Sequence, residues 1–495
     1  MKADRGRFRK SLFIFRRDLR LADNTGLERA LRASAEVVPA FILDPRQTGR
    51  HPYRSAPALQ FLVASLAELD RALRARGTHL YVFQGEAEKV VSALTRSEAI
   101  DAVLTNRDYT PFSRRRDRAV EEACRERNAV FISAGDTLLN EPEDVSKSGG
   151  GPYTVFTPFF VAARSRSVRP PRESRASNFF SGRIAADKGL TAADRLTGRP
   201  SESLFRKGGR PEALAVLSRL GRLGDYGRTR DLPGAEGTTG LSPHNKFGTI
   251  SIREFHRAVT KRLGAGHPLL RQLYWRDFFT HVAFHFERVF GRPFRAEYER
   301  IAWREDPSGF RRWREGTTGF PLVDAGMRQL AASGFMHNRV RLVCASFLVK
   351  DLHIDWREGE RYFATRLEDY DPCVNNGNWQ WIASTGCDAA PYFRVFNPWL
   401  QQKRHDPEAV YIKRWVPELA GSEPAFIHGL DRFEGRRPGG YPAPLVNHAA
   451  ESVRALVMYR SARAGTGRAA SADDSPQGPG NKKRARLKAR PRRPV

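Results

Sequence analysis

The sequence predicts a molecule of two unlike domains: an N-terminal α/β domain with a five-stranded parallel sheet, and a C-terminal domain made of helices. Two observations lead to this fold class. Between residues 9 and 138, five short apolar runs alternate with helical patterns, as βαβ units of a doubly wound sheet do. After residue 210, apolar side chains recur mostly at helical spacing. A chain of 495 residues has room for both domains.

The predicted sheet resembles a Rossmann fold but lacks its nucleotide-binding signature. The five predicted strands are Ser11–Phe15, Val37–Leu43, His79–Phe83, Ala102–Thr105 and Val130–Ser133. Between them lie helical patterns such as Ala56–Arg76, where leucines recur at helical spacing. The first strand runs into Arg16-Arg17-Asp18-Leu19-Arg20, and the glycine-rich GxGxxG turn is missing. This domain therefore need not hold the main cofactor.

The rest of the chain divides into a connector, a helical domain and a tail. Residues 139–209 are predicted to form a long connector, because periodic patterns fade there into Gly, Pro, Ser and Arg. The helical domain is predicted to span residues 210–460. Its clearest helices are Ile252–Leu263, Leu269–Phe290, Pro321–Ala332 and Asn338–Leu352. Residues 461–495 are rich in Ser, Pro, Gly and basic side chains, and this composition predicts a disordered basic tail.

The charge of the chain points to a polyanionic partner. There are 84 Lys and Arg against 55 Asp and Glu, a net charge of +29, and the excess is not confined to the tail. Nucleic acid is favoured over an acidic membrane because no amphipathic anchor is evident. Charge that serves only solubility is the alternative interpretation.

Other sequence features exclude several classes. No apolar run is long enough to span a membrane, and the first ten residues lack the apolar stretch of a signal peptide, so a cytoplasmic protein is expected. The four cysteines are too few and too scattered for a disulfide framework. None of them pairs at the spacing of a zinc or iron–sulfur site, so no metal site is expected.

Tryptophan is concentrated in the predicted helical domain, where all eight lie past residue 274. Packing in a core is the ordinary role of such a side chain. However, Gln272, Trp275 and Arg276 lie at i, i+3 and i+4 in one predicted helix and therefore share a face. An amide, an indole and a guanidinium on one stripe suit a pocket that stacks a flat ring and hydrogen-bonds its edge.

Two later segments carry similar polar side chains. One face of the next predicted helix holds Asn338, Arg341 and Leu342. Further along, the segment 369–381 contains two carboxylates, three asparagines and two tryptophans. Pro372 and Gly377 predict that this segment is a loop, because both residues break helices. Solvated loop charge or helix capping is the alternative role for Asp369 and Asp371.

Taken together, these residues resemble the DNA photolyase and cryptochrome family, in particular the class I cyclobutane pyrimidine dimer photolyases. The resemblance covers roughly residues 11–419. Its motifs are Phe13-Ile14-Phe15-Arg16-Arg17-Asp18-Leu19-Arg20, Thr238-Thr239-Gly240-Leu241-Ser242-Pro243, Tyr274-Trp275-Arg276-Asp277-Phe278, Met336-His337-Asn338-Arg339, Asp355-Trp356-Arg357-Glu358-Gly359 and Asn375-Asn376-Gly377-Asn378-Trp379-Gln380-Trp381. The resemblance implies an N-terminal antenna domain and one U-shaped FAD in the helical domain.

The resemblance also implies which residues hold the FAD. The phosphate cradle would consist of Tyr226, Thr238, Thr239, Leu241 and Ser242. The other FAD-binding residues would be Gln272, Arg276, Asn338, Arg341, Asp369, Asp371 and Asn375. Within this set, Asp369 would pair with Arg341, Asp371 would accept from a ring N–H, and Asn375 would face flavin N5. An amide at the last position goes with repair in the family rather than with signalling.

The activity implied is light-driven repair: excited FADH⁻ donates an electron to a flipped-out pyrimidine dimer in UV-damaged DNA, and the electron returns after the ring is split. The implied catalytic residues are Gln272, Trp275, Asn338, Leu342, Asn375 and Trp381. Trp379, Trp356 and Trp303 match the family's electron relay from flavin to surface. Trp275 and Trp381 would form the walls around the dimer, and Arg339 would anchor a DNA phosphate.

Two positions depart from the dimer photolyases. Gln272 stands where they usually have a glutamate, and Leu342 stands where they have a methionine. However, the paired histidines of (6-4) photolyases are also absent, because their positions hold Asn338 and Leu342. Dimer repair is therefore the preferred function. A (6-4) photolyase, a cryptochrome-type photoreceptor and a DNA binder without photochemistry are the alternatives.

The antenna and the assembly state are less defined by the sequence. The folate-type antenna motif is not matched, because its place reads Phe112-Ser113-Arg114. A deazaflavin, another flavin or no second chromophore therefore stay open. The resemblance implies a monomer, associated with the nucleoid if the cell is prokaryotic.

Overall fold

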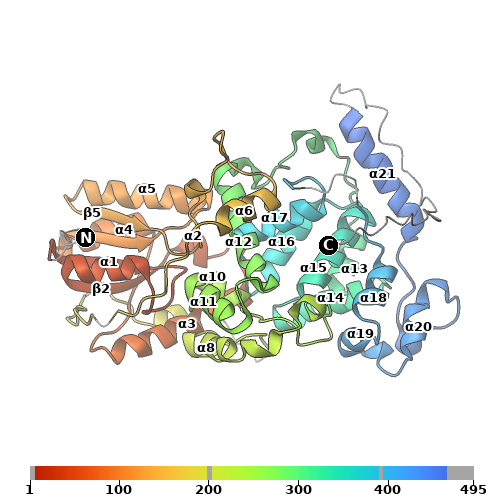
Figure 1. Ribbon diagram of the computed structural model, residues 1–495, viewed down its shortest axis with the longest axis horizontal. Helices are drawn as coiled ribbons and strands as arrows, with labels where there is room; N and C mark the ends of the chain where they lie inside the picture. Colours follow the sequence, from red (N-terminus) through yellow and green to blue (C-terminus); the bar gives the residue numbers. More distant parts are fainter. Residues whose placement is uncertain (1–5, 175, 198–202, 389–393, 465–495) are drawn as a thin grey trace, which may run out of the picture.

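The computed structural model describes residues 6–174, 176–197, 203–388 and 394–464. The α/β domain lies at one end of the long axis and the helical domain at the other (Figure 1). Helices α10, α11 and α12 lie between the sheet and the remaining helices of the C-terminal domain, so they form the junction between the two parts.

The N-terminal domain is the predicted five-stranded parallel sheet. Its strands are β1 (Phe8–Phe15), β2 (Ser34–Leu43), β3 (Tyr81–Gln84), β4 (Ala102–Asn106) and β5 (Val130–Ala134). The strand order is β3-β2-β1-β4-β5, and every neighbouring pair is parallel. The order reverses between β1 and β4, and crevices at the carboxyl ends of strands form at such a switch point. All five predicted strands are confirmed, although β1 and β2 begin three residues earlier than predicted.

Two pairs of helices cover the two faces of the sheet. These helices are α1 (Thr25–Ala33), α3 (Ala56–Arg74), α4 (Ala87–Ser97) and α5 (Pro111–Arg125), with a short α2 (Pro45–Thr48) before α3. Apolar side chains of α1 and α3 share one core with the sheet, and those of α4 and α5 share the other. This layering buries the sheet on both sides, as the near-continuous apolar runs of its strands require.

The predicted connector contains a helix that the sequence pattern did not indicate. Its elements are η1 (Pro142–Asp144), α6 (Phe156–Arg164) and α7 (Thr191–Asp194). Helix α6 buries Phe156 and Phe159 against α12 of the helical domain. Further along, Asn178 and Phe180 hydrogen-bond the backbone of Val37 in β2. The connector therefore packs against both domains instead of merely joining them.

The helical domain is built around one large core that many of its helices share. Its α-helices are α8 (Arg210–Ser218), α9 (Tyr226–Thr229), α10 (Ser242–Phe247), α11 (Ile252–Leu263), α12 (Pro268–His285), α13 (Pro307–Glu315), α14 (Pro321–Ser333), α15 (Asn338–Lys350), α16 (Trp356–Arg366), α17 (Pro372–Ile382), α18 (Pro398–His405), α19 (Val410–Trp415), α20 (Pro424–His428) and α21 (His448–Ala464). Short 3₁₀ turns join several of them: η2 (Leu220–Leu223), η3 (Glu287–Val289), η4 (Ala296–Arg300), η5 (Pro417–Leu419), η6 (Leu430–Arg432) and η7 (Pro438–Gly440). The largest core joins α14, α15, α16 and α17.

The predicted helices are confirmed with small changes at their ends. The helix predicted at residues 269–290 ends at His285 and is followed by the 3₁₀ turn η3. At the end of the domain, α21 continues four residues past the predicted boundary at residue 460. The remainder of the predicted tail, residues 465–495, lies outside the described residues.

The prediction of a loop across segment 369–381 is wrong, because all of it after Asp371 belongs to helix α17. Pro372 does not break this helix, since it occupies the first turn, where a missing N–H costs nothing. Asp371 caps the helix: its Oδ1 accepts from the N–H groups of Cys373 and Val374 at 3.0 and 3.2 Å. Gly377 lies against the ring of Phe279, which a Cβ would overlap, so this glycine serves close packing.

Candidate functional site

A single large cavity gathers most of the predicted site residues. It has a volume of about 440 Å³ and lies in the helical domain, lined from α10, α12, α15 and α17 and from the segment before α10. The predicted residues that line it are Tyr226, Thr238, Thr239, Leu241, Ser242, Gln272, Trp275, Arg276, Asn338, Arg341, Leu342, Asp369, Asp371, Asn375, Trp379 and Trp381. Residues distant in sequence thus converge on one pocket of a size that ligands occupy.

The segment Thr238–Ser242 forms one end of the pocket. The Thr239 hydroxyl accepts a hydrogen bond from the N–H of Leu241 at 3.2 Å and fixes a turn. Gly240 adopts a left-handed conformation with φ +61°, which glycine adopts without strain. Arg206 donates to the carbonyl oxygens of Thr239 and Gly240 at 3.2 and 3.3 Å. These contacts hold the hydroxyl-bearing segment in place, as a phosphate cradle requires.

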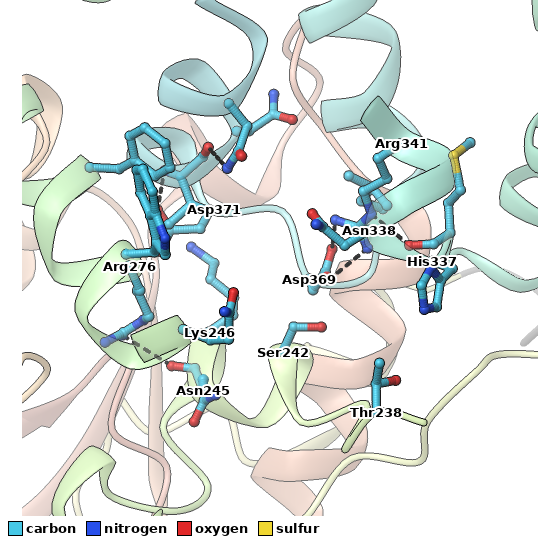
Figure 2. A pocket seen from close by; sticks show the side chains of 18 of the residues that line it. Thr238, Ser242, Asn245, Lys246, Arg276, His337, Asn338, Arg341, Asp369 and Asp371 are labelled. Atoms are coloured by element: carbon cyan, nitrogen blue, oxygen red, sulfur yellow. Dashed lines mark hydrogen bonds and ion pairs between the residues drawn. The ribbon is translucent and has the colours of Figure 1, made fainter. Parts of the chain in front are cut away.

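A bidentate ion pair lies across the pocket from this segment. Arg341 binds Asp369 through two parallel hydrogen bonds of 3.1 and 2.9 Å, and its Nε donates to the carbonyl of Met336 at 2.7 Å. Figure 2 shows this pair beside Asn338, facing Arg276 and Asp371 across the cavity. Fork-shaped pairing of this kind fixes both side chains. The resemblance implied a pairing between Arg341 and Asp369, and the structure contains this ion pair.

The floor of the pocket carries two polar groups that the sequence analysis missed. The Oδ1 of Asn245 is buried and has no hydrogen-bond partner among the described residues. Lys246 lines the cavity, and its side chain points toward Asp371 (Figure 2). Burial and the nearby charge of Arg17 lower the pKa of Lys246 to about 8. A buried acceptor without a partner among the described residues and an ammonium on the cavity wall fit a polar, partly anionic ligand such as FAD.

Helix α17 contributes Asn375 and Trp379 to the wall of the cavity. The Nδ2 of Asn375 donates to the backbone carbonyl of Glu360 at 3.1 Å, which orients the amide. Trp379 is 3% exposed and packs over Gly359, where a Cβ would overlap its ring. The close approach of α16 to α17 at this glycine therefore fixes the indole at the cavity wall.

The other two predicted relay residues, Trp356 and Trp303, differ in burial. Trp356 is 1% exposed and belongs to the same core as Trp379. Trp303 is partly buried and packs between this core and Tyr459 of α21, with ring centroids 6.2 Å apart. Neither Trp356 nor Trp303 lines the cavity. Of the three predicted relay residues, Trp379 and Trp356 are therefore both buried, and only Trp303 is partly exposed.

The two predicted aromatic walls have different surroundings. The ring of Trp275 stacks on Phe156 of the connector helix α6, with centroids 3.6 Å apart and planes 6° apart. Trp381 is partly buried against the large core and lines the cavity. The connector helix α6 thus packs against Trp275, one of the two predicted walls of the pocket.

Of the three predicted DNA-binding residues, Arg339 is the one that lies outside the cavity. It does not line the cavity, and its guanidinium pairs with Asp231 at 3.0 Å. Its side chain keeps 20% of its surface exposed. For Arg339 to contact a phosphate, Asp231 must share or release it.

The described part of the chain contains neither a metal-binding cluster nor a membrane-spanning helix. Within the described residues, no group of three or more His, Cys, Asp or Glu side chains is arranged to hold a metal ion. None of the described helices combines the length and apolar character needed to cross a bilayer.

The fold and the cavity define a class of two-domain protein: a Rossmann-like domain without a dinucleotide signature, and a helical domain that holds the main ligand. Comparison with protein-family models gives the same division into two domains. Residues 11–175 match the model described as DNA photolyase, and residues 269–461 match the FAD binding domain of DNA photolyase. The chain belongs to the DNA photolyase family, and its helical domain is an FAD-binding domain.

Individual relatives match along nearly the whole chain. The deoxyribodipyrimidine photo-lyase of Escherichia coli K12 is 37% identical over 477 residues, which cover 92% of this chain and 99% of that protein. That of Alkalihalophilus pseudofirmus is 36% identical over 471 residues, covering 90% and 97%.

Solved structures show the same fold. An archaeal photolyase from Sulfolobus tokodaii with two FAD molecules has a TM-score of 0.83 at 43% identity, covering 91% of this chain and all of that one. A class III photolyase from Agrobacterium tumefaciens has a TM-score of 0.86 at 32% identity, covering 93% and 99%. A cryptochrome from Synechocystis also matches, with a TM-score of 0.83 at 29% identity and coverage of 91% and 99%.

Proposed function

We propose that this protein repairs cyclobutane pyrimidine dimers in DNA by light-driven electron transfer. The observation that carries the proposal is that one cavity joins the flavin-facing residues Asp371 and Asn375 to the aromatic walls Trp275 and Trp381. The named relatives, deoxyribodipyrimidine photo-lyases at 36–37% identity over about nine-tenths of the chain, support this choice of lesion. Repair by electron transfer leaves no net redox change.

The residues around the pocket would hold FAD by its two ends. The hydroxyls of Thr238, Thr239 and Ser242 would bind the phosphates, and Arg341 with Asp369 would border the ring system. When bound and reduced, FAD supplies the electron that splits the dimer after absorption of blue light. The protein contributes fixed dipoles and charges that need not reorganise during the transfer.

The lesion side of the cavity would clamp two fused pyrimidines. Trp275 and Trp381 would hold them between aromatic surfaces, and the amides of Gln272 and Asn338 would hydrogen-bond their carbonyl oxygens. Leu342 would supply apolar contact. A dimer stacks poorly in the duplex, so it is extruded at a lower free-energy cost than an intact pair. The imidazole pair needed for (6-4) chemistry is missing at these positions, which favours the dimer as substrate.

The direct test is illumination of purified, reduced protein with synthetic oligonucleotides. With a cyclobutane thymine dimer, we expect blue light to restore absorbance at 260 nm, whereas a dark sample and an oligonucleotide with a (6-4) lesion stay unchanged. Repair of the (6-4) lesion alone would contradict the proposal. A coloured protein that repairs neither lesion would instead support the photoreceptor alternative, for which the similarity to the Synechocystis cryptochrome is the specific observation.

DNA binding itself should depend on salt in two ways. The basic body predicts that affinity for undamaged duplex falls steeply between about 50 and 200 mM salt, through counterion release. Discrimination in favour of a lesion-bearing duplex rests on the pocket and should change much less. Fluorescence anisotropy with matched duplexes at several salt concentrations measures both quantities.

We propose that the protein acts as a cytoplasmic monomer.

We further propose that the α/β domain binds a second chromophore, and that a flavin is the leading candidate. The Sulfolobus tokodaii structure, which is described with two FAD molecules, is 43% identical to this chain. The place of the folate motif holds Phe112-Ser113-Arg114 instead, which speaks against folate. Acid extraction followed by chromatography tests this: two flavins per chain would support it, and one flavin with a folate would contradict it.

A further inference from the structure

We propose that Arg17, at the end of the first strand of the α/β domain, is a positioning residue for the flavin pocket of the helical domain. It binds Asp371, the carboxylate on the cavity wall, and thereby fixes the orientation and charge of that group. This inference rests on FAD occupying the pocket as proposed above. It assigns the α/β domain a part in the electrostatics of the main cofactor site.

The position of Arg17 in the sheet explains how it reaches another domain. It follows β1, and Asp108 follows β4, so both residues stand at the carboxyl ends of the two strands between which the strand order reverses. The end of α10 docks onto this edge. Gly248, with φ +63°, approaches the backbone of Arg17 so closely that a Cβ would overlap it. The N–H of Leu19 donates to the carbonyl of Phe247 at 3.0 Å.

All three nitrogens of the Arg17 guanidinium are engaged, and two of them bind the helical domain. Its Nε donates to the carbonyl of Lys246 at 3.2 Å, and its Nη1 donates to Asp108 at 3.1 Å. Its Nη2 pairs with Oδ2 of Asp371. The side chain is 13% exposed. A planar fork held on three sides cannot rotate without breaking contacts in both domains.

Asp371 in turn has both oxygens committed. Its Oδ1 caps α17 by accepting from the N–H groups of Cys373 and Val374. Its Oδ2 is the atom that Arg17 binds. The lone pairs that remain on the carboxylate are therefore aimed by two fixed contacts, one from each domain. Asp371 lines the cavity with this orientation, as a fixed acceptor for a ligand N–H.

The charges around Asp371 keep it ionised. Burial alone would raise the pKa of Asp371, but Arg17, Lys246 and Arg276 lower it to about 2. Asp108 balances Arg17 from the α/β domain. Three cations therefore face two carboxylates at this end of the pocket, and the excess positive charge suits a reduced, anionic flavin.

The neighbouring Arg16 provides a matched control. It follows the same strand and its side chain is 9% exposed, but it pairs with Asp117 at 2.7 Å within the α/β domain. It does not line the cavity. Arg16→Gln therefore removes a similar buried cation from the same segment without touching Asp371.

The test compares purified holoproteins by flavin affinity and by the flavin midpoint potential. Arg17→Gln should raise the dissociation constant for FAD at least tenfold and lower the midpoint potential, because the reduced anion loses a stabilising charge. Arg17→Lys should recover part of both effects, since it keeps the charge without the fork. Arg16→Gln should match the wild type in both measurements.

A double-mutant cycle shows whether Arg17 acts through Asp371. In an Asp371→Asn background, Arg17→Gln should change the dissociation constant by less than a third of its factor in the wild type. Asp108→Asn is the second variant, because it keeps the cation at position 17 beside Asp371 and so tests the contact where Arg17→Gln lowers the yield of folded protein. It leaves the charge of Arg17 in place but loosens it, and should weaken FAD binding by a smaller factor in the same direction.

Two results would overturn the inference. Arg17→Gln with unchanged affinity and potential would show that the pair does not influence the flavin. Equal losses in Arg17→Gln and Arg16→Gln would show a general effect of destabilising this segment. In both cases the wild type still holds flavin and repairs dimers, so the proposed function stands. A wild type that binds no flavin would overturn both.

Discussion

Individual buried carboxyl groups beside the pocket differ sharply in how they respond to pH. Asp371 has three cations nearby and is ionised at neutral pH. Glu368, three residues earlier, is fully buried. Its Oε2 accepts a 3.4 Å hydrogen bond from the N–H of Arg206, and its Oε1 has no hydrogen-bond partner in the described part of the chain. Burial, together with the adjacent charge of Asp369, raises the pKa of Glu368 to about 9. Glu368 is therefore protonated at neutral pH.

This difference predicts the effect of Glu368→Gln on stability. In the unfolded chain a glutamate loses its proton near pH 4.5, whereas folded Glu368 keeps it to about pH 9. Above pH 4.5 the native state thus binds the extra proton, and the free energy of unfolding falls as pH rises toward 9. Glutamine does not titrate, so the variant should be increasingly more stable than the wild type from pH 5 to pH 9. Urea denaturation at several pH values measures this; a constant difference would contradict it.

The predicted relay gives a second prediction at the scale of single residues. Trp303→Phe should slow photoreduction of oxidised flavin at least tenfold, because phenylalanine is harder to oxidise than tryptophan. Repair by protein that is already reduced should stay nearly unchanged, since Trp303 does not line the cavity that we propose to bind the lesion. Trp415→Phe is the control, because Trp415 is also partly buried against the large core but lies outside the relay. Flash illumination with absorbance detection distinguishes the two; equal loss of photoreduction and repair would refute the assignment.

At the scale of elements, the pocket depends on helices that approach one another closely. Gly359 of α16 lies under Trp379 of α17, and Gly377 of α17 lies under Phe279 of α12. At both sites a Cβ would overlap an aromatic ring. Since Trp379 and Phe279 also line the cavity, these two glycines set the shape of the pocket through helix packing.

Gly359→Ala should therefore displace Trp379 and destabilise the protein by about 1–3 kcal/mol, the usual cost of overpacking. Flavin fluorescence and photoreduction should change with it, because the indole at the cavity wall moves. Gly221→Ala is the control: Gly221 lies in η2, and a Cβ there would meet no atom within 4 Å. Thermal unfolding of both variants checks the prediction, which fails if they have the same melting temperature.

The elements also show what the sequence could predict. Helix α11 matches its predicted bounds because its signals are local: Ser251 and Glu254 form a capping box at its start. The prediction for α17 was wrong because Pro372 and Gly377 have roles set by position and by a distant neighbour, Phe279. Local pattern reading assigns such residues to loops.

The pocket was predicted in a different way. Helical spacing already placed Gln272, Trp275 and Arg276 on one pocket face, the resemblance to a family supplied most of the other residues, and the cavity gathers sixteen of the predicted residues. Arg17 belonged to a matched motif but had no role assigned, because its partner Asp371 lies 354 positions away and no periodicity connects them. Helix α6 was missed for a similar reason, since its aromatic residues are explained by Trp275 and Phe278 of α12.

At the scale of the whole molecule, a buried ionic cluster joins the two domains. Arg253 of α11 pairs with Asp23 at 2.8 Å and with Asp136 at 2.6 Å. Asp23 precedes α1 and Asp136 follows β5, so the partners belong to the α/β domain, and Arg20 and Arg169 add further charge to the same cluster. The side chains of Arg253, Asp23 and Asp136 are each at most 6% exposed. Loss of one partner from such a cluster, or separation of the two domains, leaves buried charges unpaired and destabilises the protein.

Arg253→Gln should therefore lower the free energy of unfolding by about 3–5 kcal/mol, because it leaves two buried carboxylates short of a cation. Since all eight tryptophans lie past residue 274, tryptophan fluorescence reports the helical domain, whereas far-UV circular dichroism reports both domains. The two urea transitions should coincide in the wild type and separate in the variant, where the domains lose their coupling. Arg32→Gln, which removes a half-exposed pair with Glu28 at 3.6 Å, should change stability by less than about 0.5 kcal/mol. Coincident transitions in Arg253→Gln would show instead that apolar contacts at the junction suffice to keep the two domains one cooperative unit.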